Sequence, residues 1–371
     1  MPLPSCRSRR HNPCYLCCQF LLVAIVAGGG FLVPSLAVGQ SAPSHVAVAL
    51  TGGKVIPTAG SPFSGNSPTM GVDATLLWQQ DDPQQYWTRF WHQPDFGLRV
   101  NYAHVTNGIA GDRFGLAATL QCPLTRHIDW GYSFGFSFYN RPYSRTHNPD
   151  NSYIGSVVNC LIDVGLAAHL PLDGTHDLFV AGKVVHSSNG YLYKPNHGLN
   201  FLQAELGCRF GPVRQALRPS GTDSLFVSHG HLFLSIAPGA AMSRNDPIDE
   251  IVFYPAYMVE MGYVRYYHSC LAAGGALDLS YNYAHRLLAP EDEWPVYPAL
   301  TVFGDCIWGP VVLRLGVAHY LAYYPQNWFQ YYERVGVYYR FGADMRQHAG
   351  VGMKVHGDHI DFIEWTYAIE F

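Results

Sequence analysis

The sequence predicts an all-β protein, a transmembrane antiparallel up-and-down β-barrel with about 12 to 14 strands, and three observations support this. The chain has 371 residues, of which only 13% are charged and 14% are aromatic. Beyond about residue 40, no segment stays apolar over the ~20 residues that a spanning helix needs. Segments of alternating polarity instead recur, with turn residues between them, and helical periodicity is not sustained anywhere.

Alternation is clearest in residues 128–138, where all even positions are apolar and all odd positions are small or polar. A soluble two-sheet sandwich also alternates in this way. The polar faces of the expected strands, however, carry charged and amide side chains opposite apolar ones: Arg99, Asn101, Asp278, Asn282, Arg314, Arg334, Arg340, Lys354, Glu364 and Glu370. This distribution favours a water-filled lumen inside an apolar belt.

The last strand is expected at Asp361 to Phe371, with large apolar residues at alternate positions and an aromatic residue at the end of the sequence. It resembles the C-terminal strand of bacterial outer-membrane barrels, where the final aromatic residue acts as an assembly signal. Loops are expected near residues 58–70, 141–152, 212–223 and 286–296, which are rich in Pro, Ser, Asn or Asp. We expect one barrel domain, residues 40–371, and no second domain.

Residues 1–39 have the features of a secretory signal peptide. Three arginines precede an apolar run from Phe20 to Val38, and Ala37-Val38-Gly39 supplies the small residues that a signal peptidase reads, so cleavage is expected before Gln40. The alternative is a retained N-terminal anchor helix.

Cysteine usage and charge exclude several classes of function. The cysteines beyond this segment are widely spaced and odd in number, which argues against a disulfide framework and a zinc site: Cys122, Cys160, Cys208, Cys270 and Cys306. We therefore expect no metal and no cofactor. A net charge of −4 gives no indication of nucleic-acid binding.

Residues 186–190, His-Ser-Ser-Asn-Gly, followed by Lys-Pro-Asn-His-Gly-Leu-Asn at 194–200, combine a possible base, nucleophile and oxyanion donor. Residues i and i+2 share one face of a strand, so His186 and Ser188 point the same way. Val180 and Val184 lie on that face and Lys183 on the other. The pair is therefore expected to face lipid.

The His-x-Ser-Asn and Pro-Asn-x-Gly patterns within Val185 to Asn200 resemble those of PagL-type lipid A 3-O-deacylases and the related acyloxyacyl hydrolase-like outer-membrane proteins. The resemblance implies that His186 is the general base, that Ser188 is the nucleophile, and that Asn189 and the Gly190 backbone amide form the oxyanion hole. It also implies a catalytic role for Asn200, but the family has a glutamate at that position. An amide can orient an imidazole by hydrogen bonding but cannot stabilise imidazolium with a charge.

Two expectations about geometry accompany this assignment. Glu205 is a tempting substitute for the missing acid, but strand parity places it on the lumen face with Lys183 and Arg209. A regular strand through Tyr193 would set Asn200 several residues from Ser188, so contact with His186 requires a looped hairpin end.

The expected function is that of a serine esterase in the bacterial cell outer membrane, which removes an ester-linked fatty acyl chain from the lipid A of lipopolysaccharide. The alternatives are a non-enzymatic porin-like or structural barrel and an outer-membrane phospholipase. A lipid-facing His186 and Ser188 favour an esterase, whereas a lumen-facing pair favours a channel. The acyl position that is cleaved and the oligomeric state stay open.

Overall fold

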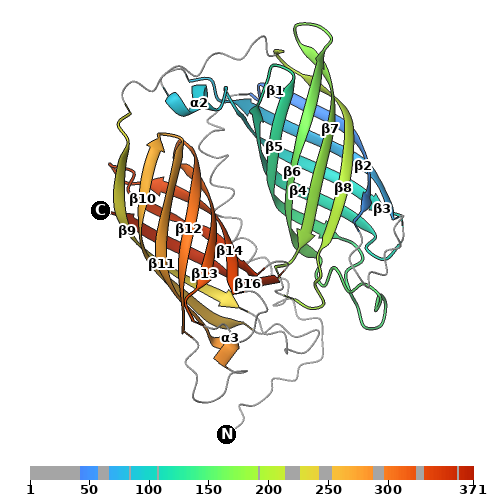
Figure 1. Cartoon of the computed structure of the whole chain (residues 1–371). Helices are drawn as coiled ribbons and strands as arrows, with labels where there is room; N and C mark the ends of the chain where they lie inside the picture. The colour runs from blue at the N-terminus through green and yellow to red at the C-terminus, as the bar shows by residue number, and fades with distance from the viewer. Residues whose placement is uncertain are drawn as a thin grey trace.

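The computed structural model describes residues 42–56, 67–82, 85–106, 108–190, 193–213, 226–241, 253–286, 296–322, 330–356 and 359–371. The strands in these ranges form two closed antiparallel barrels of eight strands each (Figure 1). The first barrel contains β1 (His45–Val55), β2 (Pro68–Gln79), β3 (Asp95–Val105), β4 (Asp112–Pro123), β5 (Ile128–Tyr139), β6 (Val158–Pro171), β7 (His176–Ser188) and β8 (Leu199–Phe210). The second contains β9 (His229–Ala241), β10 (Tyr254–His268), β11 (Leu271–Asn282), β12 (Val296–Trp308), β13 (Val311–Tyr320), β14 (Tyr331–Phe341), β15 (Gln347–His356) and β16 (His359–Glu370).

The prediction of an all-β antiparallel barrel is confirmed, but the expected single barrel of about 12 to 14 strands is not what forms. β8 pairs with β1, so the sheet closes after eight strands, and β9 begins a second sheet that closes on β16. Alternation reports which face of a strand is apolar, and it does not report which strand closes the sheet. The predicted signal peptide, residues 1–39, lies outside the described residues.

Both barrels present apolar side chains on the outside. Leu50 is 68% exposed in the first barrel, and Val302 is equally exposed in the second. The strands are 10 to 15 residues long, and a tilted strand of about 9 to 11 residues crosses a bilayer. No helix in the described part of the chain is long and apolar enough to cross a membrane.

Paired charges fill the interior of the first barrel. Arg99 on β3 is fully surrounded and forms ion pairs with Asp73, Asp163 and Glu205, which come from three other strands. Lys183 Nζ lies 2.9 Å from Glu205 Oε2. A cavity of about 40 Å³ lies beside this cluster, and its polar lining includes Gln121, Asp129 and His169. An eight-stranded barrel is just wide enough for side chains to fill much of its interior, so the lumen of the first barrel is narrow and lined by these paired charges.

The second barrel repeats this design with different residues. Arg334 on β14 forms ion pairs with Glu260 and Glu364, and Lys354 Nζ lies 3.1 Å from Asp361 Oδ2. The polar faces identified in the sequence are therefore interior faces in both barrels.

A short helix of the first barrel packs against one end of the second. α2 (Tyr86–Phe90) lies between β2 and β3 in the chain (Figure 1). The Tyr86 hydroxyl is 3.0 Å from His268 Nε2 at the end of β10. Just after α2, Trp91 donates a hydrogen bond of 3.0 Å to the carbonyl oxygen of Ile307, and its ring packs on Trp308 with centroids 5.1 Å apart. The two barrels therefore contact each other near their short turns.

The Arg99 cluster predicts a large loss of stability in Arg99→Met. Removing the guanidinium leaves three carboxylates buried without their main counter-charge, and breaking a buried ion pair in this way costs about 3–5 kcal/mol. Arg126→Met, which removes an exposed arginine from the turn after β4, is the matched control. Unfolding in detergent, followed by heat-modified mobility on gels, should show a much lower midpoint for Arg99→Met alone. Equal midpoints would contradict the assigned role of the cluster.

Candidate active site

β7 and β8 place the motif at the end of their hairpin. Their pairing includes His186 opposite Asn200 and Ser187 opposite Leu199, and residues 189–198 then form the connection. His186 Nδ1 lies 2.8 Å from Asn200 Oδ1. The looped hairpin end that the sequence analysis required is present, and the described geometry brings base and amide together.

This contact selects the tautomer of His186. Asn200 Oδ1 can only accept, so His186 Nδ1 donates to it and Nε2 keeps its lone pair. A neutral imidazole held in this way can take a proton at Nε2.

The side chains of the motif lie on the outer face of the barrel. Val184 on the same face is 46% exposed, whereas Val185 is buried inside. Ser187 points inward, where its hydroxyl accepts a hydrogen bond of 3.2 Å from Ser137. Ser188 lies on the outer face but is only 6% exposed.

Gly198 brings His186 and Ser188 together. A Cβ atom added to Gly198 would lie 3.0 Å from His186 Cε1 and 3.1 Å from Ser188 Cβ, so both side chains border the same point. The φ angle of Gly198 is +69°, a conformation that other residues adopt only with strain. Among the described residues, no hydrogen bond joins Ser188 to His186, and such contacts commonly tighten when substrate binds.

Gly190 supplies a backbone donor beside the serine. Its N–H donates to Ser188 Oγ over 3.3 Å, and its φ of +65° again needs glycine. An amide in this position can donate to an oxyanion that forms at Ser188.

Asn189 is engaged in the loop itself. Its Nδ2 donates to Ser156 Oγ over 3.1 Å and to the carbonyl oxygen of Tyr193 over 2.8 Å, and its backbone N–H donates to Asn196 Oδ1. Both of its side-chain donor hydrogens therefore hold the hairpin connection, and a contact with an oxyanion would require exchanging one of them.

The loop between β5 and β6 forms hydrogen bonds with the motif, and the sequence did not predict this contact. The Gly198 N–H donates to the Tyr153 carbonyl oxygen over 3.1 Å, and Ser156 accepts from Asn189. Gly155 allows this approach, because a Cβ atom there would lie 2.3 Å from the Pro195 carbonyl oxygen. The only signal in the sequence was the polar composition of 141–152, which predicts a loop and not its position.

Strand parity also placed the charged residues correctly. Glu205 is buried inside the barrel with Arg99 and Lys183, so it cannot orient His186. Arg209 also lies inside, with Nη2 2.8 Å from Asp177 Oδ2. The five cysteines in the described part of the chain are free, and no group of three potential ligands there is arranged to hold a metal ion.

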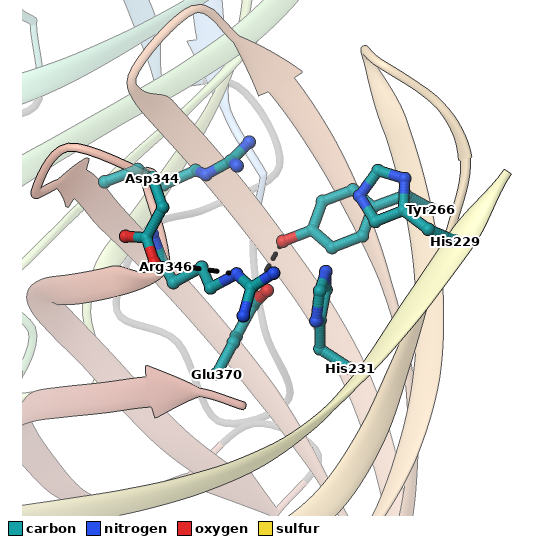
Figure 2. Close-up of a pocket in the computed structure, with 7 residues that line it drawn as sticks. His229, His231, Tyr266, Asp344, Arg346 and Glu370 are labelled. Atoms are coloured by element: carbon teal, nitrogen blue, oxygen red, sulfur yellow. Dashed lines mark hydrogen bonds and ion pairs between the residues drawn. The ribbon is translucent and has the colours of Figure 1, made fainter. Parts of the chain in front are cut away.

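A larger cavity, of about 280 Å³, lies in the second barrel near the C-terminal end of β16 (Figure 2). It is lined by His229, His231, Tyr266, Arg340, Asp344, Arg346 and Glu370. Tyr266 donates a hydrogen bond of 2.6 Å to Glu370, and Arg346 pairs with Asp344 at 3.6 Å. The lining has no serine or cysteine that could act as a nucleophile, so the candidate active site is the one at Ser188.

Two family models match the chain, one for each barrel. The first, lipid A 3-O-deacylase (PagL), matches residues 73–209 and includes the whole motif. The second, the C-terminal domain of acyloxyacyl hydrolase, matches residues 226–371. Together they cover most of the chain. No curated protein matches it.

Solved structures similar to the chain include point mutants of the porin from Rhodopseudomonas blastica. Two of them are 13% identical, and a triple mutant is 12% identical. Each comparison covers 89% of this chain and 99% of the porin, with a TM-score of 0.20. A TM-score this low carries no information about architecture or function.

The position of Gly198 predicts that Gly198→Ala slows the reaction of Ser188 with a fluorophosphonate probe. The new methyl group would displace His186 or Ser188. A rise of about 1.4 kcal/mol in the activation free energy makes labelling about tenfold slower. Gly182→Ala is the matched control, because it lies on the same face of β7 and its Cβ would meet nothing within 4 Å. Equal labelling rates, measured by mass spectrometry of the Ser188 peptide, would contradict the assigned geometry.

Proposed function

The chain belongs to the lipid A 3-O-deacylase (PagL) and acyloxyacyl hydrolase-like family, and from this premise we propose that it is a serine esterase of the bacterial outer membrane that removes an ester-linked fatty acyl chain from lipid A. One observation carries the proposal: the His186 side chain, hydrogen-bonded to Asn200, lies next to Ser188 beside Gly198 on the outer face of the barrel. An ester approaches this face from outside the barrel, and because Ser188 is only 6% exposed, the residues that cover it must shift to admit the ester.

The proposed reaction is a two-step acyl transfer. Ser188 Oγ attacks the carbonyl carbon of the ester while His186 Nε2 takes the hydroxyl proton. The tetrahedral intermediate then breaks its bond to the lipid A oxygen, which receives the proton from His186 and leaves as a hydroxyl. Water attacks the acyl-serine in the same way, which releases the fatty acid and restores Ser188.

The oxyanion of the intermediate forms next to Ser188 Oγ, where the Gly190 N–H already donates. Asn189 is the second donor in our proposal, and it reaches the oxyanion by giving up its bond to Ser156 or Tyr193. Each such donor typically contributes about 2.7–4 kcal/mol to lowering the barrier.

The end of the barrel that carries the motif supports lipid A as substrate. Residues 140–157 and 189–198 form long connections at this end, whereas at the other end residues 124–127 and 172–175 form short turns and only residues 80–94, which carry α2, form a longer connection. Outer-membrane barrels have long extracellular loops and short periplasmic turns. Ser188 would then lie level with the outer leaflet, where lipopolysaccharide is the lipid.

The packed interior argues against the porin-like alternative. A channel needs a continuous water-filled passage, and Arg99 with its three carboxylates occupies the centre of the first barrel. The phospholipase alternative shares the same chemistry, and the assay below distinguishes it by substrate.

Ser188→Ala and His186→Ala are each expected to lower the rate of fatty-acid release from purified lipid A by about four orders of magnitude or more, because each removes a group that acts in both steps. Ser187→Ala is the control, since it removes a neighbouring serine that points into the barrel. Mass spectrometry of the products identifies the acyl position. Full activity in Ser188→Ala would refute the nucleophile assignment, and release from phospholipid alone would favour the phospholipase.

Asn200→Asp replaces the orienting amide by a carboxylate of the same shape, 2.8 Å from His186 Nδ1. The charge stabilises imidazolium, so we expect a higher maximal rate. The acid limb of the pH–rate profile should move to higher pH, because the added carboxylate keeps His186 in its protonated, inactive form up to a higher pH. Asn200→Ala should lower the rate, but less than His186→Ala does. An unchanged profile in both variants would show that Asn200 does not act on the base.

We also propose that the mature protein lacks residues 1–39, as the basic start, apolar run and small-residue exit indicate. N-terminal sequencing of protein extracted from the outer membrane should begin at Gln40. Recovery of Met1 would favour the retained anchor instead.

A further inference from the structure

Ile363 is an outward-facing residue of the second barrel that is nevertheless buried. It is 6% exposed, whereas Tyr367 on the same face of β16 is 40% exposed. A Cβ atom added to Gly190 would lie 3.2 Å from Ile363 Cδ1 and 3.7 Å from Ile360 Cδ1. The second barrel therefore places two isoleucines against the residue whose amide donates to Ser188.

A β-bulge puts both isoleucines on this face. Lys354 pairs with Phe362 and Val355 pairs with Ile360, so Asp361 is the extra residue of β16. Residues three positions apart in a regular strand face opposite ways, and the bulge restores Ile360 to the side of Ile363. Asp361 is held inside the barrel, where Lys354 Nζ lies 3.1 Å and Asn282 Nδ2 2.9 Å from its carboxylate.

We propose that Ile360 and Ile363 form an apolar wall that binds the acyl chain of the substrate, so that the second barrel selects chain length for the active site of the first. This inference rests on the proposed esterase function. The ester carbonyl must lie between Ser188 Oγ and the Gly190 N–H, and the acyl chain begins at that carbon. Its first methylenes are then within reach of the side chains that contact Gly190.

The chemistry of the wall suits this role. Both side chains are apolar and branched, and neither can donate or accept a hydrogen bond. Each methylene that an apolar surface removes from water contributes about a fourfold gain in affinity. A wall that contacts several methylenes therefore discriminates strongly between short and long chains.

The test compares hydrolysis of p-nitrophenyl butanoate, octanoate, dodecanoate and hexadecanoate by the full-length protein in detergent. Ile363→Ala is expected to lower kcat/KM for the long esters by about tenfold and for butanoate by less than about twofold. Ile363→Trp, which extends the wall toward Gly190, should move the preferred chain to a shorter ester. Ile360→Ala supplies an independent variant should Ile363→Trp fail to fold.

Ile369→Ala is the matched control, because Ile369 lies on the same face of β16 near its other end, where it pairs with Gln347. Its chain-length profile should equal that of the wild-type protein. If Ile363→Ala and Ile360→Ala slow all esters equally, the isoleucines only hold the barrels together and the inference is overturned. If the wild-type protein shows no Ser188-dependent hydrolysis of any ester or lipid A, the proposed function itself fails, and this inference with it.

Discussion

The ion pairs of Arg99 are the constraint on which the first barrel depends. One guanidinium joins carboxylates from β2, β6 and β8 to β3, across a sheet that only β8 and β1 can close. Charges of this kind are tolerated only where they pair, so every odd position of β7 and β8 near Lys183 and Glu205 must face inward. Since faces alternate, the same constraint sends His186 and Ser188 outward.

That direction decides which substrates can meet the site. A serine inside the barrel would meet only what enters the lumen, and Arg99 with its three carboxylates narrows that lumen in the described part of the first barrel. A serine on the outer face is instead approached from outside the barrel. Asn200 stands where the resembled family has a glutamate, and its side chain still contacts the imidazole, because Asn200 Oδ1 is 2.8 Å from His186 Nδ1.

The second barrel has its own internal ion pairs, between Arg334 and both Glu260 and Glu364. The two meet at both ends: Trp91 packs on Trp308 near the short turns, and Ile363 contacts Gly190 near the motif. A second barrel that touches the reactive loop offers a physical reason for the two to occur in one chain. The motif is therefore bordered on one side by the second barrel, whose Ile360 and Ile363 lie against Gly190.

The sequence by itself predicted antiparallel strands, the inner and outer faces of those near the motif, and the motif itself, because side-chain alternation and motif spacing are local properties; its 12 to 14 strands fell short of the sixteen that the described residues form. Lys183, Glu205 and Arg209 lie inside as parity requires. Tertiary structure alone decided that the sheet closes after eight strands, that the loop before β6 holds Asn189 and Gly198, and that a bulge at Asp361 turns two isoleucines toward Gly190. These features join residues far apart in the chain, and no period within one strand carries information about the partner that the strand will find.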